Sequence, residues 1–553
     1  MRLRGRAEQK RRQQHKHRFV HGGAIIAPAH GIERCSLRWA IVGAIFTAQL
    51  QNGEGYSKVA NARSVVAAAT RWIADRSGFE RGRTAYNADA EGGRGLPTPI
   101  INTSNEPLDE IRTERLRTAF RGDIIRAGDP EYDSARSIWN AGAARRPGMI
   151  ARCTGVADVA AAVAFGRENA LLTSVRGGGH NVGGRALCDD GLVIDLTRMR
   201  NVFVDPSART VRVGGGARLG DVDHETHVFG LAVPLGINST TGVGGLTLGG
   251  GVGWLIRKYG MSIDNLLSCQ VVTAEGQCIA ASAHENEELF WALRGGGGNF
   301  GVVTSFEFRA HPVRNVIGGM LMFSRTEAFD VLRSFRDFML TAPDELTAYA
   351  ALLHTPDGAP VVAILPCYCG DLAEGERVLA PLRQFGSPVM DAVQPMPFPV
   401  QQSLLDAAFP HGHHNYWKSS MHHTLSDEAI AAIVDQASLM TSPLSAVVVE
   451  YYAGAAGRVG DTETAFPHRQ VPWDIVVVAH WTDATETPRH RAWARGVVQA
   501  LTPWASGGHI LGALDADEEA NSAFGSNLPR LAAVKKRYDP TNFFRVNQNI
   551  KPS

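Results

Sequence analysis

The sequence lacks paired cysteines, long apolar runs and a surplus of charge of either sign. Its seven cysteines are scattered over 553 residues without a Cys-x-x-Cys pair. This pattern predicts neither a disulfide framework nor a zinc or other metal site, and it favours a reducing, cytoplasmic compartment. Residues 39–48 are apolar, but they cover only about half of the roughly 20 residues that a membrane span needs. The net charge of +1 gives no argument for a nucleic-acid or membrane partner.

The small net charge hides an uneven distribution. Residues 1–20 contain eight Lys or Arg against the single acidic Glu8, which leaves 48 basic and 54 acidic residues in the rest of the chain. Such a basic run favours a solvated arm over a nucleic-acid patch. Residues 91–106 are rich in Gly, Pro and Asn, as linkers are. We therefore predict that residues 1–107 are an extension, either disordered or produced by a misplaced start codon, and assign it no function.

Glycine is abundant, and it is concentrated in four stretches between Arg176 and Gly301. These stretches are Arg176–Asn181, Thr240–Gly245, Gly249–Gly253 and Arg294–Gly301. Glycine lets the backbone approach a ligand closely, and successive N–H groups can form a concavity that binds a diphosphate. One such loop is usually a plain turn, but four loops beside apolar runs indicate a dinucleotide lying across them. A Gly-x-Gly-x-x-Gly helix start with a later acidic residue is missing, which disfavours a Rossmann domain.

Periodic apolar residues predict strands and helices on both sides of these loops. Before the first loop we expect a short helix at 135–140 and a strand–helix–strand unit at 149–153, 156–165 and 171–175. Two hairpins are expected next, at 202–213 and 271–281. The length of the chain predicts two or more domains, and the second region has strands at 316–323, 361–365, 447–452 and 473–481. Helices begin there after Ser426 and at Thr487, which fits an α+β domain.

Ordered motifs give the chain a family resemblance. They are Arg176-Gly-Gly-Gly-His-Asn, Leu192-Val-Ile-Asp-Leu, Arg257-Lys-Tyr-Gly with Asp264-Asn, Leu289-Phe-Trp-Ala-Leu-Arg-Gly-Gly-Gly-Gly-Asn-Phe-Gly and Tyr538-Asp-Pro-Thr-Asn-Phe-Phe-Arg-Val-Asn-Gln-Asn-Ile. From about Leu108 to Ser553 the chain resembles the berberine-bridge-enzyme-like FAD-linked oxidases of the vanillyl-alcohol-oxidase/PCMH superfamily. The resemblance implies a PCMH-type FAD-binding domain of two α/β subdomains at 108–312. It also implies a substrate domain with an antiparallel sheet covered by helices at 313–502, and a C-terminal segment at 503–553 that completes the FAD site.

The resemblance also implies which residues hold FAD. The expected set is Arg176, Gly177, Gly178, Gly179, His180, Asn181, Gly242, Gly244, Gly245, Gly249, Gly250, Gly253, Asp264, Gly301, Val302, Asn547, Gln548 and Asn549. Judged from its neighbours alone, His180 is as consistent with capping a turn as with a site role. The family attaches FAD covalently, through the 8α-methyl group, at this histidine. Members with a second link carry a cysteine where this chain has Asn238, so one link is expected.

The catalytic residues are less well defined, because two family motifs are altered. The usual Tyr-Val-Asn-Phe is His509-Ile-Leu-Gly here, and a usual Tyr-Asn pair is Trp473-Asp474. The remaining candidates are Asp474, His509, Tyr416 and Lys418, each of which, taken singly, fits a structural role better than a catalytic one. Asp474 lies at the end of a predicted strand that should face the flavin. Desolvation beside Trp473 is expected to raise its pKa towards a range useful for a base.

Three functions remain open at this point. The first is an FAD-dependent oxidase that removes a hydride from an alcohol, a sugar or a secondary metabolite and passes the electrons to O2. The second is a dehydrogenase with the same half-reaction and another electron acceptor. The third is a flavin-binding protein with a degenerate pocket. The expected partners are a small-molecule substrate and O2, with no nucleic acid or membrane, and the fold itself does not name the substrate.

Overall fold

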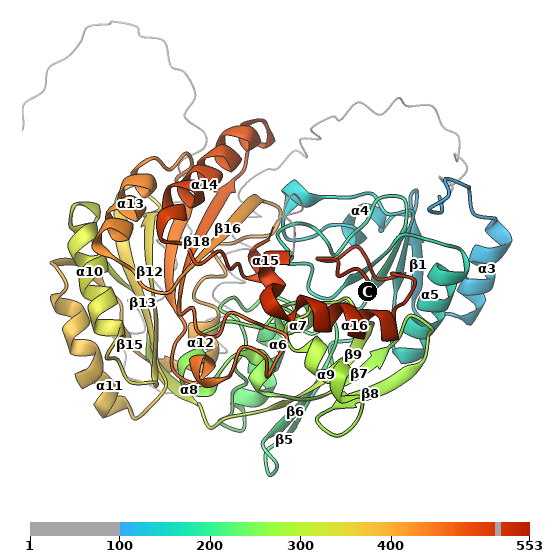
Figure 1. The fold of residues 1–553 in the computed structure, drawn as a ribbon, viewed down its shortest axis with the longest axis horizontal. Coiled ribbons are helices and arrows are strands. Elements are labelled where there is room, and N and C mark those ends of the chain that lie inside the picture. The colour runs from blue at the N-terminus through green and yellow to red at the C-terminus, as the bar shows by residue number, and fades with distance from the viewer. Residues whose placement is uncertain (1–99, 515–520) are drawn as a thin grey trace, which may run out of the picture. The chain divides into compact units, whose positions relative to one another are not determined.

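The computed structural model describes residues 100–514 and 521–553 (Figure 1). Most of the expected extension, residues 1–99, lies outside the described residues. The predicted boundary at residue 107 needs a correction, because residues 100–107 pack onto the fold. Ile100 is buried among apolar side chains, and the Thr103 N–H donates to the Ala170 carbonyl at 3.0 Å. The folded part therefore includes these residues.

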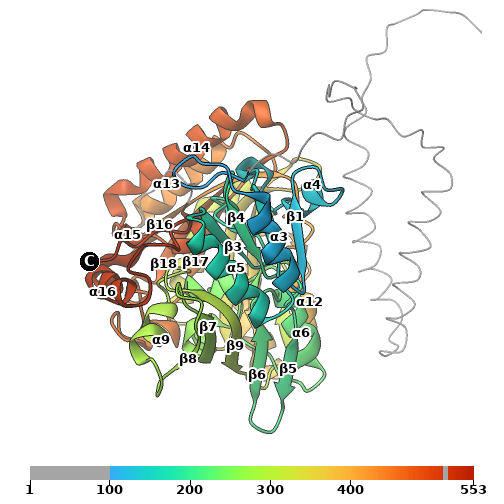
Figure 2. The ribbon, with the colours of Figure 1, turned by 90° about the vertical axis from the view of Figure 1, so that its right-hand side faces the viewer.

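A four-stranded sheet forms the first α/β subdomain. Its order is β1 (Asp123–Arg126), β2 (Met149–Arg152), β4 (Leu192–Asp195) and β3 (Thr173–Arg176), with β1 antiparallel and the other pairs parallel. Helix α5 (Val156–Glu168) connects β2 to β3 and lies beside α3 (Glu110–Ala119) (Figure 2). The predicted strand–helix–strand unit is confirmed, and β3 ends where the first glycine loop begins.

The helix predicted at 135–140 is wrong. The structure has α4 at Tyr132–Ala135 instead, followed by an irregular segment and a short 3-10 turn at Ala141–Ala143. Tyr132 fixes α4, because its hydroxyl donates to the Pro147 carbonyl at 2.7 Å. The carbonyls of Ala135 and Ser137 accept hydrogen bonds from the Arg176 guanidinium. The Trp139 N–H donates to the Gly179 carbonyl at 3.2 Å, so the helical bond from Trp139 to Ala135 does not form.

The second α/β subdomain contains an antiparallel sheet of five strands. Their order is β5 (Val202–Asp205), β6 (Thr210–Gly214), β9 (Val302–Arg309), β7 (Leu266–Val272) and β8 (Cys278–Ser282). Both predicted hairpins, β5 with β6 and β7 with β8, are confirmed. The helices of this part of the chain are α6 (Leu219–His227), α7 (Val243–Leu248), α8 (Ile256–Tyr259) and α9 (Glu287–Leu293).

The substrate domain is built on a nine-stranded antiparallel sheet. The main path runs β14 (Pro388–Asp391), β11 (Leu321–Ser324), β13 (Pro360–Tyr368), β12 (Leu346–His354), β17 (Ala446–Tyr451), β18 (Trp473–Trp481) and β16 (His414–His422). Strands β10 (Asn315–Gly318) and β15 (Gln394–Pro397) join it through β13. One face packs against α10 (Ala328–Met339), α13 (Asp427–Ser438) and α14 (Thr487–Leu501) (Figure 1). Helices α11 (Leu372–Leu379) and α12 (Phe398–Gln402) complete the domain.

The single strand predicted at 316–323 is wrong, because the chain forms β10 and β11 there. Gly319 separates them with a φ of 123°, a left-handed conformation that favours glycine. A Cβ on Gly319 would lie 2.2 Å from the Ala392 carbonyl oxygen. The sequence around it is apolar throughout, so the break carries no hydropathy signal.

The chain ends beside the glycine loops. Helix α15 (Asn521–Phe524) is followed by α16 (Leu528–Tyr538), which packs against α9. The predicted helix through Tyr538 is confirmed. After it, Phe543 and Phe544 pack in the core of the first subdomain, and Asn547 and Ile550 bond to Gly298 and Asn299 of the second. Across residues 100–514 and 521–553, no helix combines the length and the apolarity that crossing a lipid bilayer would require.

Candidate functional site

The glycine-rich stretches, far apart in sequence, meet in the structure. A Cβ on Gly178 would lie 2.4 Å from the backbone nitrogen of Gly242, and a Cβ on Gly242 would lie 2.3 Å from that of Gly178. Two loops can cross at this distance only if both positions are glycine. The Gly297 N–H donates to the carbonyl of Leu248, the residue before the third stretch, at 2.9 Å, which joins the last loop to the start of the third. The loops therefore form one surface.

The C-terminal tail is tied to this surface by its amide side chains. Asn547 donates through Nδ2 to the Gly298 carbonyl at 2.8 Å. The Asn299 side chain donates to the Gln548 carbonyl at 3.1 Å and accepts from the Ile550 N–H at 3.0 Å. Gln548 donates through Nε2 to the Leu511 carbonyl at 3.1 Å. These bonds hold the tail against residues 294–301, in keeping with the expected return of the tail to this site.

His180 lies between an aromatic ring and a hydroxyl. Its imidazole stacks on Trp139, with ring centroids 5.1 Å apart and planes within 13°. Its Nε2 is 3.0 Å from Thr240 Oγ1. Burial, reinforced by the positive charge of Arg218 and by His411, lowers the His180 pKa to about 4, so the ring is neutral at physiological pH.

The hydrogen bonds around Thr240 decide which nitrogen of His180 carries the proton. The Thr240 backbone N–H donates to Asn238 at 3.1 Å, so the contacting atom must be the amide oxygen Oδ1. That oxygen can only accept, so the Thr240 hydroxyl, 2.6 Å away, donates to it. Thr240 Oγ1 must then accept from His180 Nε2–H, which leaves the lone pair on Nδ1. Asn238 thus fixes the tautomer of His180 through the Thr240 hydroxyl.

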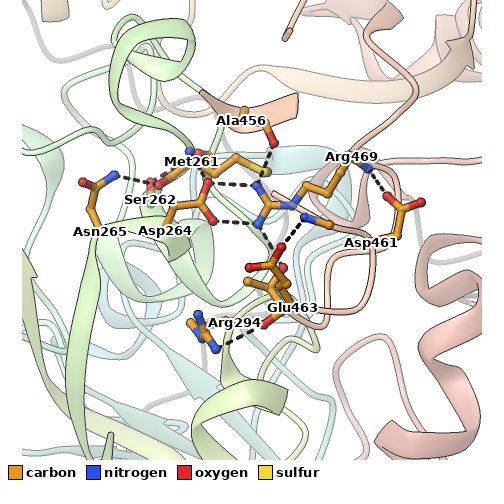
Figure 3. Close-up of polar contacts among 12 residues, drawn as sticks. Met261, Ser262, Asp264, Asn265, Arg294, Ala456, Asp461, Glu463 and Arg469 are labelled. Atoms are coloured by element: carbon orange, nitrogen blue, oxygen red, sulfur yellow. Dashed lines mark hydrogen bonds and ion pairs between the residues drawn. The ribbon is translucent and has the colours of Figure 1, made fainter. Parts of the chain in front are cut away.

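Both charged members of the expected cofactor set, Arg176 and Asp264, have side chains engaged inside the protein. Arg176 donates to the Ala135 and Ser137 carbonyls, as described above. Asp264 pairs through both oxygens with the guanidinium of Arg469, at 2.8 and 2.7 Å, and also accepts from the Met261 N–H at 2.8 Å (Figure 3). These contacts give both residues a positioning role beside the glycine loops.

The other members lie in or next to the loops. Asn181 accepts through Oδ1 from the Arg185 N–H at 3.1 Å, and Val302 is a buried residue at the start of β9. Backbone crowding or a positive φ accounts for six glycines among them: Gly177, Gly179, Gly244, Gly250, Gly253 and Gly301. Each of these has a positive φ or would place a Cβ within 3.1 Å of another residue, whereas a Cβ on Gly245 would have open space and one on Gly249 would make only ordinary contacts.

Two carboxyl groups face each other across β17 and β18. Glu450 is directly opposite Asp474 in the strand register, and both side chains are buried. Ser419 Oγ donates to Asp474 at 2.7 Å, and the Tyr452 hydroxyl contacts both Glu450 and Asp474, the latter at 3.2 Å. Sequence reasoning found Asp474 but missed Glu450 and Tyr452. The sequence signal that could have indicated Glu450 is that it is the single carboxylate within the apolar run Val447–Tyr452.

Burial raises the pKa of both carboxyl groups. For Asp474 the pKa rises to about 6, opposed by hydrogen bonds from Ser419 and Tyr452. For Glu450 it rises to about 8, because burial and the nearby charge of Asp474 both disfavour ionisation. The pair therefore holds about one proton at neutral pH. The raised pKa predicted for Asp474 is confirmed. The predicted cause, desolvation by Trp473, is wrong, because consecutive strand residues point to opposite faces and the Trp473 side chain packs on the other face of the sheet.

A short segment joins these carboxyl groups to the glycine loops. His509 Nδ1 contacts the Ser419 carbonyl at 2.8 Å, so Nδ1 carries a proton and donates it to this oxygen. The next residue, Ile510, donates its N–H to Ser419 Oγ at 3.4 Å. Leu511 then packs beside Gly249 and Gly297, where its Cδ2 is 3.8 and 3.2 Å from the positions of added Cβ atoms. His509 and Asp474 thus lie together, close to the loops.

Tyr416 and Lys418, the other predicted catalytic candidates, lie away from Asp474 and His509. Tyr416 is buried among the side chains that pack under α14, and its hydroxyl accepts from Arg495 Nε at 3.0 Å. The Lys418 ammonium lies 5.4 Å from the Tyr416 ring centroid, on the same face. Asp474 occupies the opposite face of the sheet with Ser419. Residues at even and odd positions of β16 point to opposite faces, and this separates the two groups.

Known proteins share these features. Residues 147–282 match the model of the FAD binding domain, and residues 512–551 match the berberine and berberine like model. The (R)-6-hydroxynicotine oxidase of Paenarthrobacter nicotinovorans is 33% identical over 449 residues, which cover 78% of this chain and 97% of that protein. An FAD-linked oxidoreductase of Dictyostelium discoideum is 33% identical over 439 residues, covering 78% and 95%. The crystal structure of 6-hydroxy-D-nicotine oxidase from Arthrobacter nicotinovorans superimposes with a TM-score of 0.73 at 32% identity, covering 78% and 98%.

The chain belongs to the berberine-bridge-enzyme-like FAD-linked oxidoreductases. The residues of this FAD-linked oxidoreductase fit the cofactor. Buried polar atoms beside the loops, Oδ1 of Asn547, Oδ1 of Asn549 and Oγ1 of Thr247, have no hydrogen-bond partner in the protein. Buried polar groups are normally paired, so these atoms are available to a ligand. The crossing at Gly178 and Gly242 provides backbone without side chains, as a diphosphate requires.

Proposed function

We propose that this protein is an FAD-dependent oxidase. In this proposal FAD is held by a single covalent bond to His180, and hydride leaves an alcohol, a sugar or a secondary metabolite, with electrons passing to O2. One observation carries the proposal: the buried Glu450–Asp474 pair is connected through Ile510 and Leu511 to the glycine loops. The similarity to (R)-6-hydroxynicotine oxidase, which is named as an oxidase, supports oxygen as the electron acceptor.

The chain's own residues supply a base and its support. FAD, when bound, accepts the hydride and passes the electrons on. As a carboxylate, Asp474 accepts hydrogen bonds from Ser419 and Tyr452 and takes the proton of the substrate hydroxyl or amine. Glu450, protonated at neutral pH, donates to the Tyr452 oxygen, which lets the Tyr452 hydroxyl donate to Asp474. His509 and Ile510 hold Ser419 from the other side.

His180 Nδ1, unprotonated and in a neutral ring, is the nitrogen available for the covalent bond. The six cysteines within the described ranges are all free, which supports a reducing, cytoplasmic compartment.

The test of this mechanism is the anaerobic rate at which substrate reduces the flavin. A base must be ionised, so the rate in the unmodified protein should rise as pH increases through about 6, the pKa of Asp474. Asp474→Asn should lose this rise and slow reduction by about 10²–10⁴-fold. Tyr416→Phe, on the opposite face of the sheet, is the matched control and should leave the rate unchanged. A rate that survives in Asp474→Asn would remove Asp474 as the base. Peroxide release in air distinguishes an oxidase from a dehydrogenase.

A further inference from the structure

One segment of the substrate domain contacts both groups that hold the His180 ring. These groups are Trp139, which stacks on the imidazole, and Thr240, which accepts from its Nε2. Both precede the nine-stranded sheet in the chain, yet both are tied by hydrogen bonds to residues 402–415. This segment runs from the end of α12 to the start of β16, and we call it the clamp segment.

The first contact of the clamp segment is with the turn that carries Thr240. Asp406 accepts the Ser239 N–H through Oδ1 at 2.9 Å, and its Oδ2 accepts from the Ser239 hydroxyl. Ser239 lies between Asn238 and Thr240, whose side chains fix the tautomer of His180. The carboxylate of Asp406 therefore holds the backbone on which this chain of hydrogen bonds depends.

The same turn is bound on another side by the first residues of α6. The Leu219 N–H donates to the Thr241 carbonyl at 2.9 Å, and the Gly220 N–H donates to the Ser239 carbonyl at 2.8 Å. These bonds engage only carbonyl groups of the turn. The N–H and the hydroxyl of Ser239 both use Asp406 as their acceptor, and without it the turn would have to shift to pair them.

The second contact of the clamp segment is with Trp139. The indole Nε1 donates to the Phe409 carbonyl at 2.9 Å, and the Gly412 N–H donates to the Trp139 carbonyl at 3.0 Å. The indole plane is thus oriented by backbone groups of the clamp segment. Because the rings of Trp139 and His180 are stacked within 13° of parallel, fixing the indole also limits the tilt of the imidazole.

We propose that the clamp segment, through Asp406 and the Phe409 carbonyl, positions His180 for covalent attachment of FAD, so that attachment depends on the docked substrate domain. The proposal rests on the single bond from His180 to FAD in the proposed function. Asp406 acts through the turn of Ser239 and Thr240, and it is therefore a positioning residue.

Covalent attachment requires a lone pair that is held in one direction. A bond forms from His180 Nδ1 to the 8α carbon, and that carbon and the imidazole Nε2 each release one proton. The electron pair of the broken C–H bond stays on the flavin until O2 takes it up with two protons as hydrogen peroxide. A ring that is free to tilt or to change tautomer reacts more slowly, because correct orientation supplies much of the rate of such steps. Loss of the clamp contacts should therefore slow attachment more than it weakens binding of FAD to the loops.

The experiment uses the full-length protein purified with its FAD and measures two quantities. The first is total flavin per chain, from absorbance before denaturation, and the second is the covalent fraction, the share of that flavin that stays with the protein after acid precipitation. Asp406→Ala removes both acceptors of Ser239 and should lower the covalent fraction severalfold while total flavin stays near that of the unmodified protein. A folding defect alone would lower total flavin and Tm together.

Asp406→Asn is the conservative variant that should restore attachment. Its Oδ1 still accepts the Ser239 N–H, and its Nδ2 can donate to Ser239 Oγ, so the covalent fraction should match that of the unmodified protein. The neutral amide also suits Asp223, a buried residue of α6 whose pKa is raised well above its usual range by burial and by the charge of Asp406.

Two further variants complete the series. Trp139→Phe keeps an aromatic ring for His180 but removes the donor to the Phe409 carbonyl, and it should also lower the covalent fraction. Asp371→Ala is the matched control. Asp371 caps α11 in the same domain by accepting from the Glu374 N–H at 3.0 Å, so its loss should lower Tm without changing the covalent fraction.

The outcomes separate this proposal from the proposed function. An unchanged covalent fraction in Asp406→Ala overturns the role of the clamp segment and leaves the covalent bond standing. Equal losses in Asp406→Ala and Asp406→Asn, or the same loss in Asp371→Ala, overturn it as well, because the hydrogen bonds to Ser239 would not be the cause. If Asp406→Ala retains no flavin, Trp139→Phe decides, and an unchanged covalent fraction there overturns the proposal. An unmodified protein that releases all its FAD in acid removes the covalent bond from the proposed function, and the role of the clamp segment with it.

Discussion

Two side chains, Thr240 and Asn238, control which nitrogen of His180 is protonated. Thr240 accepts from His180 Nε2 and donates to Asn238 Oδ1, so the lone pair stays on Nδ1. Without the Thr240 hydroxyl, nothing in this chain of bonds would favour one nitrogen over the other. An imidazole that samples both tautomers presents the Nδ1 lone pair for only part of the time.

We therefore predict that Thr240→Val reduces the fraction of covalently bound flavin severalfold, whereas Thr240→Ser, which keeps the hydroxyl, preserves it. The measurement is flavin fluorescence of the protein band on a denaturing gel after acid treatment. The ¹⁵N chemical shifts of the His180 ring, assigned with His180→Ala, report the tautomer directly. Equal covalent fractions in Thr240→Val and the unmodified protein would contradict the tautomer argument. An unmodified protein that releases all its FAD in acid would contradict the covalent bond itself.

The residues around Asp474 show which candidate site residues the sequence alone can indicate. Asp474 could be predicted because an altered motif put a carboxylate where the family has an amide, and burial then raises its pKa as expected. Glu450 and Tyr452 could not be placed beside it, because their proximity depends on the register of β17 against β18. The face that Tyr416 occupies could not be predicted for the same reason: only the pairing of β16 with β18 places it opposite to Asp474.

Helix α16 acts at the element scale as the anchor of the tail. Lys535 and Asp539 are both fully buried and paired at 2.7 Å. The Lys535 ammonium also donates to the carbonyls of Asn299 and Phe544, each at 2.8 Å, and Asp539 accepts from the Phe543 and Phe544 N–H groups. The pair thus joins the last glycine loop to the start of the tail that carries Asn547 and Asn549.

We predict that Lys535→Met destabilises the protein by about 3–5 kcal/mol, because it leaves the Asp539 carboxylate buried without its cation. Tm should fall by several degrees, and the protein should retain less flavin, since the tail is no longer fixed. Lys536→Met is the matched control: its side chain is exposed one position away, so Tm should change little. An unchanged Tm in Lys535→Met would mean that the tail is anchored by its amide contacts alone.

The elements themselves could largely be predicted, and their arrangement could not. The bounds of β18 match the predicted strand, and Ser426 caps α13 through a hydrogen bond to the Ala429 N–H, as its position indicated. Local signals suffice there, because alternation and capping depend on neighbouring residues. The split between β10 and β11 at Gly319 was missed, since it results from contact with Ala392, 73 positions later in the chain.

At the scale of the described molecule, the FAD-binding and substrate domains are joined by a buried ion pair. Arg469, from the substrate domain, has a side chain with 1% exposure and reaches Asp264 beside the third glycine loop. Its guanidinium also donates to Thr464 Oγ1 at 2.9 Å. Nearby, Arg294 donates to the Glu463 carbonyl at 3.2 Å, which ties the fourth loop to the same segment. One short stretch of the substrate domain thus positions two cofactor loops.

Removing one partner of this pair should weaken the coupling between the domains. Asp264→Asn leaves the buried Arg469 cation without a counter-charge, which costs about 3–5 kcal/mol. Because the pair spans two domains, this loss of stability should separate the unfolding of the two domains. We expect one calorimetric transition in the unmodified protein and a broadened or split transition in Asp264→Asn.

Arg458→Gln is the control. It breaks the exposed Arg458–Asp344 pair, whose contribution is under about 1 kcal/mol, and should leave a single transition near the original Tm. If Asp264→Asn lowers Tm no more than Arg458→Gln does, the loops are positioned by their backbone contacts, and the ion pair is not what couples the two domains.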